Sequence, residues 1–214
     1  MSSERAVPGN PILAIDVALL LPEPVQERAR RVNAALWAGR PDGFRFDATH
    51  LPHITLAQQL VRRASLSVLT ERIDPVLQGV QPLALRLVGV GSSETALHFG
   101  VERTPDLQRL HENLMDALQP LEEADGSAEA FYSEGEPARE KDIEWVRQYR
   151  IKASYANFVP HITLGIGRAP ELLEPFEFTA DQVALCHLGR FCTCRVVLRE
   201  WRLEPAKRNG SLNW

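Results

Sequence analysis

The sequence predicts an α+β fold with antiparallel sheets in two lobes. The five-residue segment Pro-His-Ile-Thr-Leu occurs twice, at residues 52–56 and 160–164, and each copy opens a strand-like run. A predicted hairpin in the middle of the chain and several predicted strands at its end do not fit repeated parallel βαβ units. The chain also lacks the Gly-x-Gly-x-x-Gly and Walker phosphate loops that accompany many such folds.

In the first half, the pattern of apolar residues predicts alternating strands and helices. The predicted helix at 23–37 carries Val25, Ala29, Val32 and Leu36 on one face, and prolines flank it on both sides. The strands are β-branched, aliphatic or alternating segments. The expected elements are a strand at 12–21, the helix at 23–37, a short strand at 44–46, a strand at 53–61, a helix at 66–77 and a hairpin of strands at 83–90 and 95–101.

The second half repeats this alternation around an acidic segment. Leucines at core spacing predict a helix at 105–118. Residues 122–137 are acidic and rich in turn residues, so we expect a mobile insertion there. A helix at 139–152, the second repeat strand at 161–166, and strands at 176–178, 183–188 and 195–203 follow. No long linker interrupts the chain, so residues 1–214 are expected to form a single bilobal domain.

The composition of the chain restricts the classes of function that it can have. Apolar residues make up 44% and charged residues 24% of the 214 residues, as in an ordinary globular protein. The net charge of −4 argues against a long nucleic-acid-binding surface, but it allows a small phosphorylated ligand held by a few arginines. We see no membrane-spanning run and no signal-peptide pattern, and the three cysteines lie in one short stretch. We therefore expect a cytoplasmic monomer without a membrane partner.

The repeated segment places two polar side chains on one face of a strand. Alternate residues of a strand point to the same side, so His53 projects with Thr55, and His161 projects with Thr163. The intervening isoleucine and the following leucine point to the opposite side, into a core. If the two halves pack about a pseudo-twofold axis, all four polar side chains line one cleft.

Such a cleft suits phosphodiester chemistry without a metal. In-line displacement at phosphorus needs a base on one side and an acid on the other. Histidine can serve as either, because its ordinary pKa of about 6.5 lies near neutrality. The hydroxyls of Thr55 and Thr163 can donate to non-bridging phosphate oxygens as charge builds in the transition state.

The motifs at 53–56 and 161–164 resemble those of the 2H phosphoesterase superfamily, in particular its 2′-5′ RNA ligase-like and cyclic phosphodiesterase members. The resemblance implies a bilobal α+β fold with antiparallel sheets lining a central cleft and helices outside. It implies hydrolysis of 2′,3′-cyclic phosphates of small nucleotides or RNA ends, with no cofactor and no metal. One of His53 and His161 would activate water and the other would protonate the leaving ribose oxygen; the sequence does not say which.

Two features depart from the family pattern. The two histidines are 108 residues apart (53 to 161), more than expected for compact members, and the acidic insertion accounts for the excess. Members often carry an arginine shortly after the motif. Gln58 and Ile166 occupy the matching positions here, and Arg168 follows two residues later. The sequence therefore does not identify the residues that would bind the phosphate.

Further side chains are candidate substrate contacts. Arg190 and Arg195 can bind phosphate through two parallel hydrogen bonds, although an exposed surface position suits them equally. His98 shares a strand face with small residues and can touch a ligand, and Tyr155 can stack on a base, with core packing the alternative for Tyr155. Asp16 interrupts the first strand. We expect it to be exposed, with a carboxylate that orients a histidine as the alternative.

The remaining cluster is Cys186-His187 with Cys192 and Cys194. Its spacing matches no common zinc pattern, and alternation puts Cys186 and His187 on opposite faces, so buried thiols without a metal are expected. Three alternative functions remain. They are 2′-5′ RNA end joining through the same cleft, a non-catalytic nucleotide or RNA-end binding module, and a zinc-stabilised module.

Overall fold

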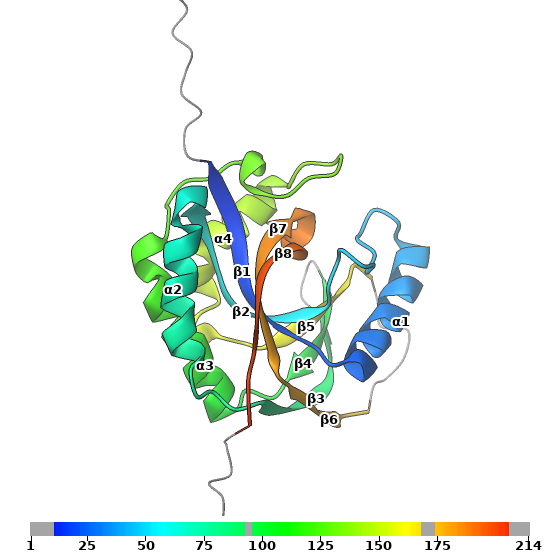
Figure 1. The fold of residues 1–214 in the computed structure, drawn as a ribbon. Coiled ribbons are helices and arrows are strands. Elements are labelled where there is room, and N and C mark those ends of the chain that lie inside the picture. Colours follow the sequence, from blue (N-terminus) through cyan, green and yellow to red (C-terminus); the bar gives the residue numbers. More distant parts are fainter. Residues whose placement is uncertain (1–10, 93–95, 168–173, 206–214) are drawn as a thin grey trace, which may run out of the picture.

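The computed structural model describes residues 11–92, 96–167 and 174–205, and it confirms the α+β fold. Within these residues, eight strands form two four-stranded antiparallel sheets (Figure 1). The first sheet has the order β2-β1-β7-β8 and the second has the order β5-β4-β3-β6. The strands are β1 (Ile12–Leu20), β2 (His53–Arg62), β3 (Leu83–Ser92), β4 (Leu97–Val101), β5 (His161–Gly165), β6 (Phe176–Ala180), β7 (Gln182–Gly189) and β8 (Thr193–Arg202).

The two repeated segments form β2 and β5, each at the edge of its sheet. Edge strands tolerate proline, which cannot donate to a ladder, so Pro52 and Pro160 fit immediately before them. The two strands also match in burial. The histidine and threonine of each motif are partly buried, whereas the isoleucine and leucine are fully buried. Ile54, Leu56, Ile162 and Leu164 belong to one hydrophobic core.

Helices from one half of the chain pack on the motif strand of the other half. The described residues contain α1 (Glu23–Gly39), α2 (Leu66–Leu77), α3 (Pro105–Leu118) and α4 (Glu140–Lys152). Helix α1, from the first half, packs on β5 of the second sheet, whereas α3 and α4 pack on β2 of the first sheet and α2 packs on α3. In Figure 1, α1 therefore lies on one side of the sheets and α2 and α3 lie on the other. Each motif strand is covered by a helix from the other half of the chain.

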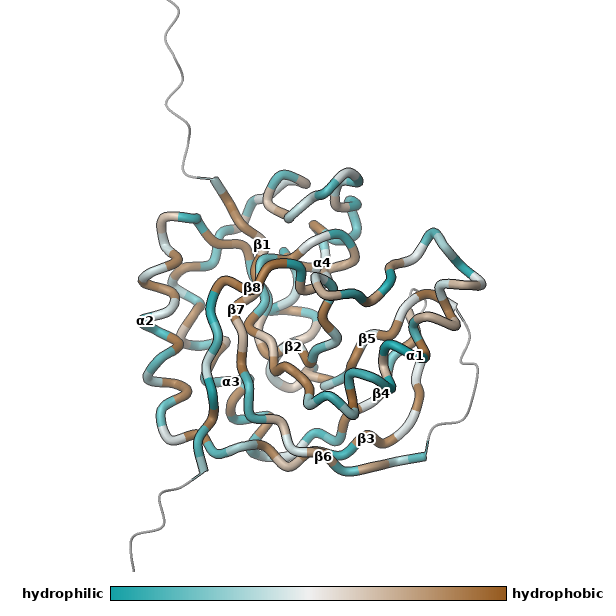
Figure 2. The backbone as a smooth tube through the Cα atoms, turned by 45° about the vertical axis from the view of Figure 1, so that its right-hand side comes forward, coloured by the Kyte–Doolittle hydropathy of each residue, from teal (hydrophilic) through white to brown (hydrophobic). Residues whose placement is uncertain are grey.

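Strand β1 is buried on both faces, as its nearly continuous apolar sequence requires. Its larger residues, such as Ile15 and Val17, face the main core. The opposite face, with Ala14 and Ala18, packs in a second core that includes residues of α4 and of the preceding acidic segment. Figure 2 shows this contrast: the central strands are mostly hydrophobic, whereas the outer helices mix hydrophilic and hydrophobic residues.

The strand expected at residues 44–46 is absent from the structure, so that prediction is wrong. Phe44 and Phe46 are both buried, and their backbone groups bind the side chain of Asn33 on α1 rather than a neighbouring strand. Asn33 Nδ2 donates to the carbonyl of Phe44, and Asn33 Oδ1 accepts from the amide of Phe46. The alternation thus reflects two buried rings in a loop.

The acidic segment at 122–137 is anchored to the first sheet, unlike the mobile insertion expected from its composition. Ala130 and Phe131 are buried in the second core, where they pack near the small residues of β1 and β7. The amide of Tyr132 donates to the carbonyl of Leu188 at 2.7 Å. A few apolar residues among the acidic ones therefore hold the segment in place.

Each motif strand contains a register shift at its leucine. In the first sheet, Ala18 pairs with Thr55 and Val17 pairs with Ala57, so Leu56 has no opposite residue. In the second sheet, His98 pairs with Thr163 and Leu97 pairs with Gly165, so Leu164 is skipped in the same way. Such a bulge leaves the extra residue outside the ladder.

The carbonyls of the two skipped leucines bind buried side chains from the other half. His111 on α3 contacts the Leu56 carbonyl through Nδ1 at 2.6 Å. Asn33 on α1 donates from Nδ2 to the Leu164 carbonyl at 2.8 Å. Both side chains are buried. A buried carbonyl without a partner is costly, so these bonds tie each motif to the opposite helix.

We expect Asn33→Leu to lower the free energy of unfolding by about 3 kcal/mol, because it leaves three buried backbone groups without their partner. Asn113→Leu, at an exposed position of α3, is the control and should change stability little. Urea unfolding followed by circular dichroism measures both. Equal midpoints for the two variants would contradict the role given to Asn33.

Candidate active site

Both motif histidines begin their strands, and each is fixed by the backbone two residues earlier. His53 Nδ1 lies 2.7 Å from the Leu51 carbonyl, and His161 Nδ1 lies 2.8 Å from the Val159 carbonyl. A carbonyl only accepts, so Nδ1 carries the proton in both rings. In the neutral imidazole, Nε2 is then free to accept a proton or to bind a ligand. The likeness of the two halves thus extends to the orientation of the rings.

A buried carboxylate stands beside the first histidine. Asp16 Oδ2 lies 3.5 Å from His53 Nε2, and Asp16 is fully buried. Burial disfavours the imidazolium, but the Asp16 carboxylate and the Leu51 carbonyl together favour it more strongly, so the pKa of His53 is raised above its ordinary value. His53 is therefore the motif histidine that retains its proton to higher pH.

Asp16 also organises the motif around it, and the expectation that it is exposed is wrong. Its Oδ2 accepts from Thr55 Oγ1 and from Gln58 Nε2, each at 2.7 Å. Gln58, where the resemblance led us to expect arginine, therefore binds a carboxylate. The alternation of residues along the first strand placed Asp16 on the face that carries small residues. This pattern could not show that distant segments of the chain cover that face.

The second histidine has a different environment. Burial lowers the pKa of His161 below its ordinary value and outweighs the Val159 carbonyl, while the nearby His98 and His53 lower it further. The rings of His98 and His161 pack edge to face with their centroids 5.1 Å apart. Leu97 pairs with Gly165 in the second sheet as Val17 pairs with Ala57 in the first. Ala96, the residue before Leu97, is therefore the counterpart of Asp16, the residue before Val17. The second half thus has no carboxylate at this position.

The position of the His98 ring depends on a glycine in the neighbouring strand. Gly91 pairs with His98 across β3 and β4, and a Cβ at Gly91 would lie only 2.4 Å from His98 Nε2. Burial lowers the pKa of His98. The structure therefore brings His98, one of the expected substrate contacts, to the second motif, and the absent side chain of Gly91 makes room for its ring.

The two candidate arginines form ion pairs with the acidic segment. Arg195 binds Glu134 at 3.0 Å and His50 Nε2 at 2.9 Å, and Arg190 forms an ion pair with Glu136. Among the polar contacts of the described residues, neither arginine touches a motif histidine. Arg168, which follows the second motif, lies outside the described residues.

Tyr155 lies on the helical side of the molecule. Its hydroxyl donates to Asp116 at 2.7 Å and accepts from Arg150 at 2.9 Å, and its amide donates to His111 Nε2. These partners belong to α3 and α4. The contacts seen for Tyr155 therefore join the helices rather than bringing its ring to His53 or His161.

The cysteine cluster divides between two environments. Cys186 and Cys194 are buried, and both belong to the second core. His187 instead contacts the Ala130 carbonyl through Nε2, and Cys192 Sγ donates to the Asp142 carbonyl. The expected separation of Cys186 from His187 agrees with these contacts.

One group in the described chain brings together at least three side chains of the types that bind metals. Asp16, His53 and Cys194 each offer an atom, and these atoms all lie within 4.8 Å of one another. Burial raises the pKa of the Cys194 thiol well above its ordinary value. Sequence spacing could not reveal this group, because its members come from β1, β2 and β8.

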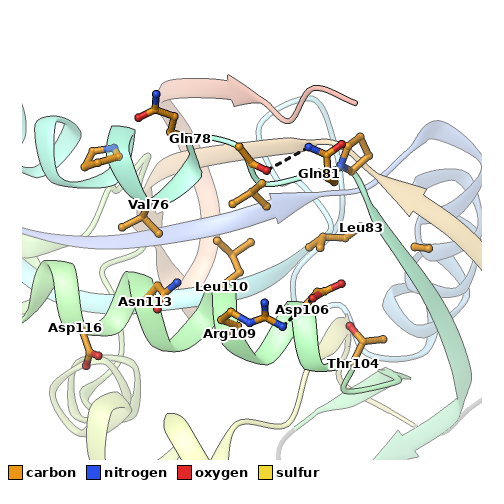
Figure 3. Close-up of a pocket in the computed structure, with 15 residues that line it drawn as sticks. Val76, Gln78, Gln81, Leu83, Thr104, Asp106, Arg109, Leu110, Asn113 and Asp116 are labelled. Carbon is orange, nitrogen blue, oxygen red and sulfur yellow. Dashed lines mark hydrogen bonds and ion pairs between the residues drawn. The ribbon is translucent and has the colours of Figure 1, made fainter. Parts of the chain in front are cut away.

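A cavity of about 960 Å³ lies elsewhere, between the end of α2 and the start of α3 (Figure 3). Its lining includes Val76, Leu110 and the ion-paired Asp106 and Arg109. None of the motif residues lines it. The chemistry suggested by the repeated histidines therefore does not belong to this cavity.

A family model described as the 2′-5′ RNA ligase superfamily matches residues 21–190. The chain belongs to this superfamily. The expected 2H phosphoesterase relationship is thereby confirmed. No curated protein matches the sequence, and no described helix is long and apolar enough to cross a membrane.

Solved structures share the fold of this 2H superfamily member at low sequence identity. TT0787 of Thermus thermophilus superposes with a TM-score of 0.58 at 19% identity, covering 91% of this chain and 100% of that chain. LigT of E. coli complexed with phosphate gives a TM-score of 0.56 at 18% identity, with 91% and 99% covered. LigT complexed with NADP+ gives 0.53 at 17% identity, with 90% and 98% covered.

We expect Asp16→Asn to lower the pKa of His53, because the neutral amide no longer favours the imidazolium while burial still opposes it. Asp47→Asn is the matched control, since Asp47 contacts His50 at 3.2 Å. NMR titration of the histidine ring signals measures both variants. A His53 pKa that stays unchanged in Asp16→Asn would refute the coupling.

Proposed function

We propose that this protein is a metal-independent phosphodiesterase that hydrolyses 2′,3′-cyclic phosphates of nucleotides or RNA ends. The observation that carries the proposal is the pair of equivalent histidines on β2 and β5. Each ring is oriented by its own backbone. Among the described residues, neither Nε2 has a backbone partner, and only His53 has a carboxylate within ion-pair distance. Two such groups can supply the acid and the base of an in-line displacement.

The surroundings of the two rings favour distinct roles. His53, beside Asp16, holds a proton more readily and is the proposed general acid that protonates the leaving ribose oxygen. His161, which forms no ion pair with a carboxylate among the described residues, is the proposed general base that takes a proton from water through Nε2. The oxygen of that water forms the new bond to phosphorus while the bond to the ribose oxygen breaks. One proton enters His161 and one leaves His53.

The two threonines would then contribute unequally. Thr163 is the proposed donor to a non-bridging phosphate oxygen, as suggested by its place beside His161 on one strand face. Thr55 donates to Asp16 in this structure. Its first role is to hold that carboxylate, and donation to phosphate would require it to leave Asp16.

Small nucleotides are the substrates that the comparisons favour. LigT of E. coli has been crystallised with phosphate and with NADP+. In this chain, His98 is the proposed nucleotide contact nearest the second motif. Arg190 and Arg195 could bind phosphates of a longer RNA end if they exchange their glutamate partners. Tyr155 could stack on a base only after leaving its helical contacts.

End joining is the second candidate, favoured by the description of the family. It would use the same two histidines in the same roles, with the 5′-hydroxyl of a second RNA in place of water: its oxygen forms the new bond to phosphorus while the bond to the leaving ribose oxygen breaks. Supplying a 5′-hydroxyl RNA together with an RNA ending in a cyclic phosphate tests it. A longer, 2′-5′-linked product supports joining, and a shortened lifetime of the cyclic phosphate alone supports hydrolysis.

We expect His161→Ala and His53→Ala each to reduce turnover of 2′,3′-cyclic mononucleotides by at least about 100-fold with chelator present, because each removes one proton-transfer group. His187→Ala, which removes a histidine bound to the Ala130 carbonyl, is the control. Circular dichroism verifies folding. A wild-type protein that binds nucleotides but does not turn them over would instead favour a binding module. Full activity in both single variants would exclude the acid and base roles given to His53 and His161.

The assigned roles also predict the pH dependence of kcat/KM. Activity rises as His161, whose pKa is lowered by burial, loses its proton, and it falls at higher pH as His53, whose pKa is raised beside Asp16, loses its own. Asp16→Asn should therefore move the alkaline limb to lower pH and move the acidic limb less. An alkaline limb that stays in place would reverse the assignment of acid and base.

A further inference from the structure

Three side chains from different strands converge beside the first motif. Asp16 comes from β1, His53 from the start of β2, and Cys194 from the start of β8. One ligand atom of each lies within 4.8 Å of the other two. Asp16 and Cys194 are buried, and the His53 side chain is only 13% exposed. Strand pairing therefore positions the group, which does not depend on a flexible surface loop.

One buried polar atom in this group has no hydrogen-bond partner among the residues that the structure describes. Asp16 Oδ2 accepts from Thr55 and Gln58, whereas Asp16 Oδ1 makes no hydrogen bond within the described part of the chain. A buried carboxylate oxygen without a partner is costly, and native structures usually satisfy such atoms with a proton donor, a water or an ion. This observation is independent of the clustering and points to a ligand.

The backbone of Leu51 supports two members of the group. Its amide donates to the Cys194 carbonyl at 3.2 Å, and its carbonyl contacts His53 Nδ1 at 2.7 Å. The ring nitrogen on the far side, Nε2, is thereby turned toward Asp16. A backbone bond to the second ring nitrogen is the usual way in which proteins orient a histidine that binds a metal.

We propose that Asp16, His53 and Cys194 form a binding site for a borderline-soft divalent cation, Zn²⁺ above all, which inhibits the enzyme. Thiolate, imidazole and carboxylate together are a ligand set that zinc accepts and that magnesium and calcium do not favour. Bonds of about 2.0–2.3 Å place tetrahedral ligand atoms roughly 3.3–3.7 Å apart. His53 Nε2 and Asp16 Oδ2 are already 3.5 Å apart, and no pair in the group exceeds 4.8 Å. Small side-chain rotations bring all three atoms to these separations, and at least one position is left for water.

Inhibition follows from which atoms the metal uses, and this part rests on the proposed function. The cation would occupy His53 Nε2, the nitrogen proposed to deliver a proton to the leaving oxygen. It would also neutralise Asp16, which holds that proton. A metal at this site therefore blocks turnover rather than assisting it. Metal binding itself can be measured whether or not the protein hydrolyses cyclic phosphates.

Titration of the purified, chelator-treated protein with Co²⁺ tests the site directly, because thiolate-bound cobalt has a charge-transfer absorption that oxygen-bound and nitrogen-bound cobalt lack. We expect one Co²⁺ per chain with this absorption, displaced by Zn²⁺. Cys194→Ser should lose the absorption and weaken Zn²⁺ binding by at least about 100-fold. Cys192→Ser is the matched control from the same turn, since its thiol binds the Asp142 carbonyl and lies outside the group.

Activity provides a second readout. Zn²⁺ should inhibit the wild type and Cys192→Ser at the concentrations at which it binds, whereas Cys194→Ser should resist Zn²⁺, with inhibition expressed relative to the metal-free activity of each variant. Thermal unfolding verifies that both variants fold. The proposal fails if the wild type shows no thiolate absorption, or if Cys194→Ser binds Zn²⁺ as tightly as the wild type. An inactive wild type that still shows the cobalt absorption would overturn the proposed function and leave the metal site in place.

Discussion

The bulge at the leucine of each motif is the constraint on which the rest of the site depends. It removes the Leu56 and Leu164 carbonyls from their ladders at the edges of two sheets. Both carbonyls are recovered by buried side chains from the opposite half, His111 and Asn33. Each histidine lies only three residues before such a leucine. The two rings are therefore held by a framework in which neither half can shift without breaking a buried hydrogen bond in the other.

Within this matched framework, the neighbours of the motifs differ. The position that holds Asp16 beside the first motif corresponds to Ala96 beside the second, and the position of Ala18 corresponds to that of His98. One carboxylate raises the pKa of His53, while burial and nearby histidines lower that of His161. Duplicated backbone thus gives two rings the same orientation, and single differences on the neighbouring strands give them different affinities for a proton.

Local patterns in the sequence predicted most of the fold, because strands and helices follow from the spacing of apolar residues. The repeat also predicted that His53 and His161 begin equivalent strands, with isoleucine and leucine behind them. The failures concern contacts between distant segments. The burial of Asp16 depends on what covers the small-residue face of β1, and Phe44 and Phe46 resemble a strand until the bonds to Asn33 are known. The acidic segment is fixed by Ala130 and Phe131, which its average composition conceals.

Asp16 connects the proposed chemistry to the proposed metal site. One of its oxygens is shared among Thr55, Gln58 and His53, which stabilises the charged form of the ring and fixes the motif. The other is buried without a partner among the described residues, on a strand that packs against the buried thiols of β7 and β8. A proton on His53 and a cation between His53 and Cys194 compensate the same negative charge. The proton and the cation both need Nε2 of His53, so only one of them can be bound at a time. The Asp16 carboxylate that favours the protonated ring is therefore also a ligand for the competing metal.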